Sequence, residues 1–324
     1  MARRFLLPRD LGCSGDPLWK RALPAMTPAL TPHKTMTQTT ACPDWATALL
    51  NGFSQVLLQR SPVCGLFCLM AIALADPHQL GGALLGAASG LFTAQRRGYD
   101  KSLRQAGLYS YNGILIGLLL THVLPWSAVL PLLIIATSGL TTLITDHWLR
   151  RCPRPTCLPA YTAPFVLLGW GVYQLAGVPS SALAHSQDWY QALATGLGQI
   201  FVLDNPGSGA LIALGLLLCN PRAALFAFAG CCAGVAFANF QGAGVSSLHG
   251  FNPALAALAF SHKAWQALLA MTLAIILEPG FTSLALPGLT APFVLACWLV
   301  KAGTRLTHQA ARDCAPLHNA GQSS

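Results

Sequence analysis

Charged residues are scarce in this chain. They make up 9% of its 324 residues, whereas an ordinary soluble domain carries about 25%. Hydrophobic residues account for 54% of the sequence, and the mean hydropathy is +0.53. This composition excludes an ordinary soluble domain, and we expect a protein that crosses a lipid bilayer roughly ten times with about 20 residues per crossing.

The scarcity of charge also limits the chemistry. Lys and Arg lie in the connections and tails and not on one face of an element, so the net charge of +9 does not predict nucleic-acid binding. A membrane-embedded enzyme, the least favoured alternative, would need acids, histidines or a nucleophile grouped at one depth. The acidic residues fall at segment ends instead. We therefore expect no catalytic residues and no cofactor.

The eleven cysteines do not predict a disulfide framework. Most lie within apolar segments, where cysteine behaves as a small hydrophobic residue. Cys152 and Cys157 form a C-P-R-P-T-C stretch, but one cysteine pair without histidine is a weak signal for a metal site. We expect no bound metal.

A stretch of thirteen residues occurs twice. Residues 158–170 read LPAYTAPFVLLGW and residues 286–298 read LPGLTAPFVLACW, identical at nine of thirteen positions and 128 residues apart. Further pairs keep the same order at offsets of 144 or 140: Gly52 and Gly196, Gln55 and Gln199, Pro62 and Pro206, Tyr111 and Phe251, Asn112 and Asn252. The order predicts two homologous membrane repeats, residues 44–178 and 188–304. Such duplication is typical of transporters and channels whose site lies at the repeat interface.

The basic residues predict how the repeats cross the membrane. Each half contains six apolar segments, the last of the first half near residues 157–175 and the fourth of the second half near 245–261. The basic clusters at 96–104 and 150–154 should face the cytoplasm together with the N-terminal tail. An even number of crossings then separates the tail from the loop at 96–104, so one of the three apolar segments between them enters and leaves on the same side. Counting back from the basic residues Lys301 and Arg305 identifies residues 190–204 as this segment in the second half and, by symmetry, residues 44–59 in the first. We expect an all-α integral membrane protein of two inverted-topology repeats, each with five transmembrane helices plus one re-entrant half-helix, and a pore at the repeat interface.

The two ends of the chain are expected to be tails. Residues 1–43 are rich in Pro, Thr and basic residues and predict a flexible cytoplasmic segment, and residues 305–324 predict a cytoplasmic C-terminal tail. The apolar run from Phe5 to Pro8 is shorter than the 7–15 residues of a secretory signal, so the first membrane segment is expected to direct insertion. We place the chain in the cell inner (plasma) membrane, multi-pass, with both termini cytoplasmic.

Three duplicated motifs carry a resemblance to a known family. They are the G-x-x-Q segments that begin at Gly52 and Gly196, the YNG and FNP triplets at 111–113 and 251–253, and the doubled L-P-x-x-T-x-P-F. Their shared order over residues 44–300 resembles the urea transporter family. The resemblance implies a homotrimer in which each protomer holds its own pore and conducts urea passively. A channel for another small neutral solute, such as a short amide or ammonia, is the alternative.

The resemblance also assigns site residues. The pore glutamines and threonines of the family match Gln55, Gln199, Thr162 and Thr290. A glutamine in a membrane segment often joins helices, and a threonine often bonds a carbonyl one turn earlier, but duplication and the flanking prolines favour the pore assignment.

Apolar side chains near the glutamines form a flat slot in the family. Three residues after each glutamine this chain has Leu58 and Val202, of which Leu58 departs from the phenylalanine common there. Asn112 and Asn252 are expected to support the pore by capping broken backbone. A second departure from the family lies before Pro62. This chain has Arg60 and Ser61 there, where the family more often has two asparagines.

The chemistry of urea explains why a lining of side-chain oxygens and apolar walls would conduct it. The molecule is planar and neutral, and each hydrogen bond that it loses on leaving water costs several kcal/mol in an apolar medium. Side-chain oxygens replace those bonds, whereas an ion in the same dry slot would remain poorly solvated. No carboxylate lies within the repeated motifs, so we expect transport without a coupled ion.

Overall fold

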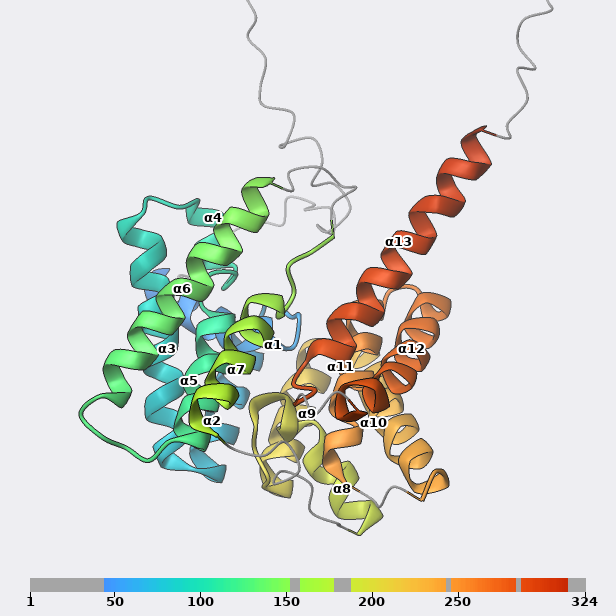
Figure 1. Ribbon diagram of the computed structural model, residues 1–324, viewed down its shortest axis with the longest axis horizontal. Coiled ribbons are helices and arrows are strands. Elements are labelled where there is room, and N and C mark those ends of the chain that lie inside the picture. The colour runs from blue at the N-terminus through green and yellow to red at the C-terminus, as the bar shows by residue number, and fades with distance from the viewer. Residues whose placement is uncertain (1–43, 152–157, 178–187, 243–245, 284–286, 314–324) are drawn as a thin grey trace, which may run out of the picture.

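The computed structural model describes residues 44–151, 158–177, 188–242, 246–283 and 287–313, and every regular element in these ranges is a helix (Figure 1). The first half of the chain contains α1 (Asp44–Val56), α2 (Pro62–Ala75), α3 (Pro77–Arg96), α4 (Lys101–Gln105), α5 (Tyr111–Val123), α6 (Leu130–Arg151) and α7 (Ala163–Ala176). The second half contains α8 (Trp189–Gly196), the 3-10 turn η3 (Gly198–Phe201), α9 (Pro206–Cys219), α10 (Pro221–Phe240), the 3-10 turn η4 (Ser247–His249), α11 (Phe251–Ala259), α12 (Ala264–Ser283) and α13 (Ala291–Asp313).

Four of these helices begin in the same way. Each of α2, α3, α9 and α10 has proline in its first turn and a capping side chain directly before it: Ser61, Asp76, Asn205 and Asn220 respectively. Each capping oxygen accepts a hydrogen bond from a backbone N–H of the first turn. Proline suits this position because the first N–H groups of a helix have no partner within the helix. The caps stand at equivalent places in the two halves.

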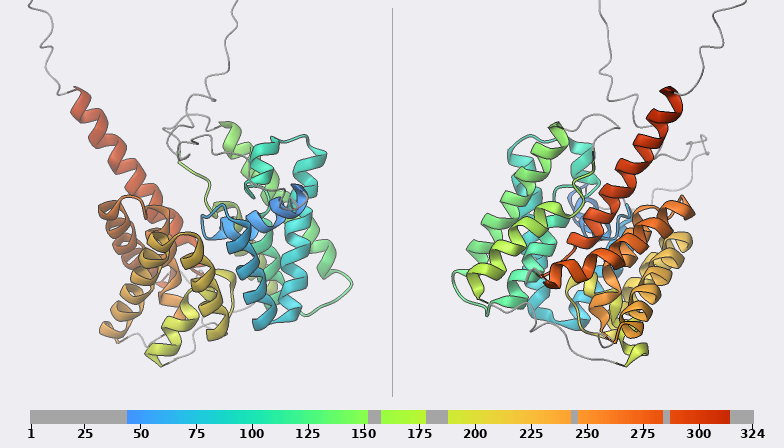
Figure 2. Two further views of the ribbon diagram at one scale, coloured as in Figure 1. Left: turned by 180° about the vertical axis from the view of Figure 1, so that it is seen from behind. Right: turned by 45° about the vertical axis from the view of Figure 1, so that its right-hand side comes forward.

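The packing of the halves repeats as well. Helix α3 packs on α5 and α6 as α10 packs on α11, and α5 contacts α7 as α11 contacts α13. Glycines permit the closest approaches: a Cβ on Gly86 would lie 2.1 Å from the carbonyl oxygen of Gly113, and one on Gly230 would lie 2.6 Å from that of Pro253. The halves meet where α2 packs against α9, in the middle of the molecule seen from behind in Figure 2.

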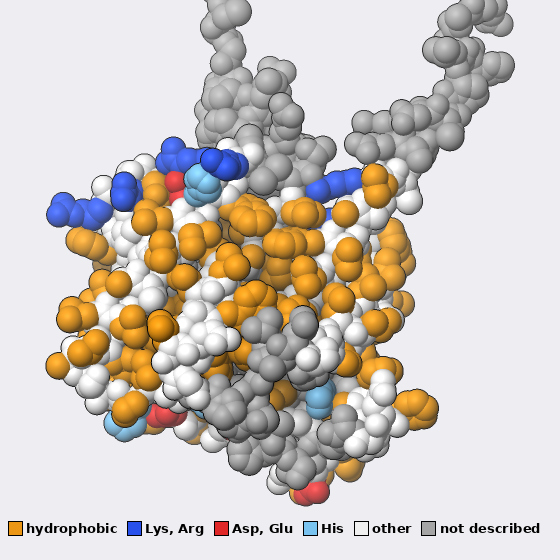
Figure 3. Space-filling model, viewed as in Figure 1, with side chains coloured by type: hydrophobic (Ala, Val, Ile, Leu, Met, Phe, Trp, Pro, Cys, Tyr) orange, Lys and Arg blue, Asp and Glu red, His pale blue; other side chains and the backbone are white. Residues whose placement is uncertain are grey.

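The surface has the character of a membrane protein. On the face shown in Figure 3, hydrophobic side chains cover the middle and Lys and Arg side chains gather along the upper edge. In the described part of the chain, three helical segments are long and apolar enough to cross a bilayer: residues 130–151, 221–240 and 264–281. Four further apolar helices, α2, α5, α7 and α9, have 13 or 14 residues, which is about 20 Å at 1.5 Å per residue and less than the hydrocarbon thickness of about 30 Å.

Several helices are shorter than the apolar segments of the sequence. The segment expected at 157–175 becomes helical at Ala163, because Pro159 and a turn precede it. The segment expected at 245–261 is divided into η4 and α11. The segment 44–59 forms α1 and then a turn, and the segment 190–204 is broken into α8 and η3. Hydrophobicity identified these segments, but prolines and tight turns determine where their helices begin and end.

The C-terminal boundary also differs from the expectation. Helix α13 continues to Asp313, nine residues past the predicted end of the second repeat at 304, and projects from the helical body (Figure 1). No proline interrupts residues 293–313, so nothing in the sequence stops the helix at 304. The tails at 1–43 and 314–324, the cysteines Cys152 and Cys157, and the connection at 178–187 lie outside the described residues.

Candidate functional site

Thr162 and Thr290 meet between the two halves. Each lies in a tight turn directly before a helix, where Ala163 N–H bonds the carbonyl of Ala160 at 3.0 Å and Ala291 N–H bonds that of Gly288 at 2.9 Å. Their hydroxyl oxygens are 2.7 Å apart, and the two residues are 2% and 3% exposed. The threonines therefore bond each other across the interface and not the carbonyls one turn earlier.

Two tryptophans frame this threonine pair from opposite halves. Trp170 Nε1 donates to the carbonyl of Pro287 at 2.9 Å, and Trp298 Nε1 donates to that of Pro159 at 2.8 Å. Each tryptophan of one half thus holds the turn that precedes the threonine of the other half. Such reciprocal contacts are those of an interface with approximate two-fold symmetry, with the threonine pair close to its axis.

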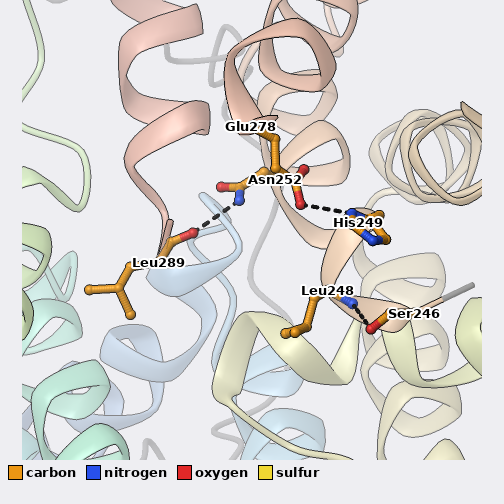
Figure 4. A network of polar contacts seen from close by, with 6 residues as sticks. All are labelled: Ser246, Leu248, His249, Asn252, Glu278 and Leu289. Carbon is orange, nitrogen blue, oxygen red and sulfur yellow. Dashed lines mark hydrogen bonds and ion pairs between the residues drawn. The ribbon is translucent and has the colours of Figure 1, made fainter. Parts of the chain in front are cut away.

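The backbone around both threonines is unusual. Tyr161 and Leu289, the residues before them, have φ of 43° and 44°, a left-handed conformation that non-glycine residues seldom adopt. Strain of this kind persists where the surrounding structure fixes it. In the first half Tyr111 Oη donates to the carbonyl of Tyr161, and in the second Asn252 Nδ2 donates to that of Leu289 at 2.9 Å (Figure 4).

The two asparagines expected to support the site therefore differ. Asn252 caps the broken backbone before α13, because its Oδ1 also accepts from Phe293 N–H at 3.4 Å. Asn112 points to α6, where its Nδ2 donates to Thr145 Oγ1 at 3.4 Å, and its buried Oδ1 has no partner among the described residues. In the first half, the side chain that holds the carbonyl of the turn, as Asn252 does in the second half, is Tyr111. Sequence reasoning overlooked it, although the pairing of Tyr111 with Phe251, which lacks the hydroxyl, was a signal.

Gln55 lies near the end of α1, and Gln199 lies within η3. A tight turn follows each: Leu58 N–H bonds the Gln55 carbonyl at 2.9 Å, and Val202 N–H bonds the Gln199 carbonyl at 3.0 Å. Leu58 and Val202 have φ of 57° and 58°. Both predicted slot residues thus occupy the same strained position, and the strain is greater for the β-branched Val202.

The side chains of the two glutamines have different surroundings. Gln199 is 8% exposed, and its Nε2 donates to Asp204 Oδ1. Because the amide nitrogen is held by the carboxylate, its oxygen faces the opposite way as an acceptor. Gln55 is half-buried, and the position equivalent to Asp204 is the exposed Arg60. Asp204 is a further residue that sequence reasoning did not assign to the site.

A polar pair also lies beside each half of the site. His249 Nδ1 is 3.1 Å from Glu278 Oε1 (Figure 4), and at the equivalent place Tyr109 Oη donates to Asp146 Oδ1 at 3.1 Å. This contact gives His249 a defined partner. Among the described residues no three His, Cys, Asp or Glu side chains are grouped to hold a metal ion.

A model of the family described as urea transporter matches residues 46–305 of this sequence. The chain belongs to the urea transporter family. It is 27% identical to Urea transporter 1 of Rattus norvegicus over 254 residues, which cover 69% of this chain and 65% of the rat protein. It is 28% identical to Urea transporter 1 of Capra hircus over 300 residues, which cover 79% of this chain and 75% of the goat protein. The match thus spans about two thirds of the length of the rat relative.

Membership of the urea transporter family agrees with the geometry of the site. The family consists of transporters and channels and not of enzymes, and the chain is an all-α, multi-pass membrane protein. The grouped side chains at the interface are hydroxyls, amides, aromatic rings and aliphatic groups, among them Tyr161, whose ring lies 5.2 Å from that of Phe293. Such groups can hydrogen-bond a small neutral molecule and enclose it between apolar walls.

Proposed function

We propose that the protein conducts urea passively across the cell inner membrane, through a narrow slot between two inverted-topology repeats. The observation that carries this proposal is the buried hydroxyl pair of Thr162 and Thr290, 2.7 Å apart, at the centre of a reciprocal interface. A hydroxyl both donates and accepts. The pair can therefore exchange its mutual hydrogen bond for bonds to the NH₂ and carbonyl groups of a urea molecule.

Gln55 and Gln199 extend the polar lining on either side of the threonines. The amide oxygens accept from NH₂ groups, while Leu58 and Val202 offer apolar walls to the flat faces of the solute. Urea would exchange water for protein acceptors step by step, which avoids the cost of several kcal/mol for each lost hydrogen bond. The side chains assigned to the lining itself are uncharged, and the Asp204 carboxylate is hydrogen-bonded to Gln199 at its edge, so Na⁺ and protons in the slot meet a desolvation penalty that urea does not.

The arrangement in the membrane follows from the same symmetry. We propose that each repeat supplies five crossings plus one re-entrant half-helix, α1 in the first and α8 with η3 in the second. Broken helices are tolerated at membrane depth where protein or a cavity satisfies their backbone. The basic side chains along one edge in Figure 3 support cytoplasmic termini by the positive-inside rule. The family resemblance further suggests a homotrimer with one pore per protomer.

Stopped-flow light scattering on proteoliposomes tests the proposal. We expect urea efflux far above that of protein-free vesicles, saturable only at high urea and unchanged by imposed proton or sodium gradients. A gradient that drives urea uphill would show that transport is coupled. Protein-containing vesicles that lose urea no faster than empty ones would refute urea conduction.

Conduction of a short amide or of ammonia is the second candidate. An ammonia pore is expected to carry paired histidines at its centre, whereas the buried pair at this interface consists of threonines. Swelling of the same vesicles in urea, acetamide and ammonia separates these functions. Urea conduction predicts that urea gives the fastest swelling.

A further inference from the structure

One cavity opens directly beside the proposed slot. It has a volume of about 310 Å³ and is lined by Ala75, Asp76, Gln79, His122, Val202, Leu203, Asp204 and Asn205. Val202 belongs to the expected slot wall, and Asp204 accepts a hydrogen bond from Gln199. At about 30 Å³ per water molecule the volume corresponds to roughly ten waters, which is enough for a small planar solute and part of its hydration shell.

The polar atoms of this cavity are mostly acceptors. Asp76 and Asp204 each use Oδ1 for a structural hydrogen bond, to His78 N–H at 2.8 Å and to Gln199 Nε2 respectively. Neither carboxylate has an ion-pair partner among the described residues, and neither Lys nor Arg lines the cavity. The space therefore holds two uncompensated negative charges.

Gln79 gives an independent indication of a ligand. Its side chain is 7% exposed, and its Oε1 is buried without a hydrogen-bond partner in the described part of the chain. Its Nε2 lies 3.5 Å from His122 Nδ1. A buried acceptor without a partner costs free energy, which a ligand carrying N–H donors removes. The second half has alanine, Ala223, at the equivalent position.

The opposite mouth is built differently. There the counterparts of Asp76 and Asp204 are Asn220 and Arg60. The counterpart of Leu203 is Gln59, whose Oε1 accepts from Asn220 Nδ2 at 3.2 Å. The hydrogen bond between Gln59 and Asn220 joins the two residues that correspond to Leu203 and Asp76. Leu203 has no polar side-chain atom, so it cannot form such a bond with Asp76 across the cavity. The acceptor-rich cavity thus belongs to one mouth of the proposed pathway.

We infer that this cavity binds planar solutes rich in N–H donors, and that guanidinium, the cationic analogue of urea, occupies it and blocks the pathway from this mouth. The blocking of the pathway rests on the proposed urea conduction, whereas the binding of guanidinium to the cavity does not depend on it. Guanidinium presents its N–H groups in a plane that matches carboxylate oxygens. A metal ion is a poorer occupant, since no group of three metal-ligating side chains is present among the described residues. The cation stops at the mouth because the uncharged slot beyond it offers no compensation for desolvation.

Titration calorimetry of the full chain in detergent tests the site without transport. We expect guanidinium chloride to bind with a Kd on the order of 1 mM, and sodium chloride at equal ionic strength to give no signal. Asp76→Asn and Asp204→Asn keep the capping and Gln199-bonding oxygens but remove the charge, and each should weaken binding by about tenfold or more. Asp188→Asn, which removes an exposed carboxylate elsewhere, is the matched control and should bind like the parent.

Urea flux in proteoliposomes then tests the block. Guanidinium should slow urea flux through the parent and through the Asp188→Asn control, and should have about tenfold less potency on the Asp204→Asn variant. Normal urea flux with no guanidinium binding overturns the inference and leaves urea conduction intact. Guanidinium binding without any urea flux supports the site and refutes the conduction. Equal binding by the parent and both Asn variants places the cation elsewhere and overturns the inference.

Discussion

The turns after Gln55 and after Gln199 have the same backbone, with φ of 57° at Leu58 and 58° at Val202. Two residues beyond each turn the side chains carry opposite charge, Arg60 in the first half and Asp204 in the second. The part that repeats is the break in the helix, which positions the glutamine and the residue three places on. The part that differs lies at Arg60 and Asp204, which the proposed function places at the two mouths of the pathway.

The turns before the two threonines give a second comparison. Tyr161 and Leu289 share a left-handed conformation, and each has its carbonyl held by a side chain from the start of the neighbouring helix. The donor is a tyrosine hydroxyl in one half and an asparagine amide in the other. What the two halves share is that the carbonyl of the turn is held, whichever side chain donates the hydrogen bond. The two halves are therefore more alike in structure than in sequence.

Adding a methyl group where two helices approach most closely should have the largest effect on stability. The effect should be equal in the two halves. A Cβ on Gly65 would lie 1.9 Å from the carbonyl oxygen of Leu50, and one on Gly209 would lie 1.8 Å from that of Ala194. Both obstacles are backbone, so Gly65→Ala and Gly209→Ala must separate two helices at a cost of about 3 kcal/mol or more. We expect loss of the monodisperse peak in size-exclusion chromatography and a lower Tm.

Gly171→Ala is the control for these variants, because a Cβ at Gly171 meets no atom within 4 Å. It should keep the Tm of the parent or raise it slightly, since alanine is the better helix former. Parent-like stability in either Gly65→Ala or Gly209→Ala would contradict the close packing of α1 on α2 or of α8 on α9.

The threonine pair should give the next largest effect. Thr162→Val or Thr290→Val keeps the shape but removes a hydroxyl worth about 1–3 kcal/mol when its partner is left unpaired, so urea flux should fall roughly ten- to a hundredfold. The two variants should behave alike, and Thr→Ser should retain most flux. Because the threonines share one hydrogen bond, the double Val variant should lose less than the product of the single losses.

Folded single Val variants that conduct urea like the parent would remove the threonines from the pathway. The pore assignment would then depend on Gln55 and Gln199. Stopped-flow measurements on vesicles with matched protein content give this comparison, and circular dichroism checks the fold of each variant.

Strain at the slot residues should give a smaller effect on stability. At an ordinary helix position glycine is less stable than alanine by about 1 kcal/mol. At Leu58 and Val202 the left-handed backbone should reverse that order, so the Gly variant exceeds the Ala variant by about 1–2 kcal/mol at both sites. Thermal unfolding in detergent measures the two differences. An Ala variant as stable as the Gly variant at either site would contradict the strained turn there.

The sequence predicted those features that depend on periodicity and duplication. The helical class follows from the apolar segments, and the correspondence of Thr162 with Thr290 follows from a motif written twice, although their mutual hydrogen bond was not predicted. The exact helix ends could not be predicted in the same way. Segment 245–261 was expected to form one crossing, yet it contains the turn η4 and the short helix α11, both of which pack against α10.

The side-chain pairings were equally hidden from the sequence. Asp204 lies five residues after Gln199, a spacing that matches no helix or strand contact, and it reaches the glutamine only because η3 and the turn at Val202 reverse the chain. Gln79 and His122 come together from α3 and α5 over 43 residues. Such contacts depend on tertiary packing, which no local pattern encodes.

The smallest expected effect concerns the two equivalent histidines, His122 and His262. His262 lies in the connection between α11 and α12, and burial lowers its pKa, with a further lowering by Lys263, Lys301 and Arg222. The unfolded chain, with a pKa of about 6.5, then takes up a proton before the folded protein does. The stability that depends on neutral His262 is therefore complete above about pH 6.5 and is lost as the pH falls through the lowered folded pKa.

Replacing His262 by Gln removes this proton uptake. We expect His262→Gln to lose less Tm than the parent when the detergent-solubilised protein is taken from about pH 7.5 to about pH 5. His122→Gln replaces the equivalent histidine of the first half, which lines the cavity that contains Asp76 and Asp204, and is the matched control for the loss of a histidine. If His262→Gln lost as much Tm as the parent, the cations around it would not govern its protonation.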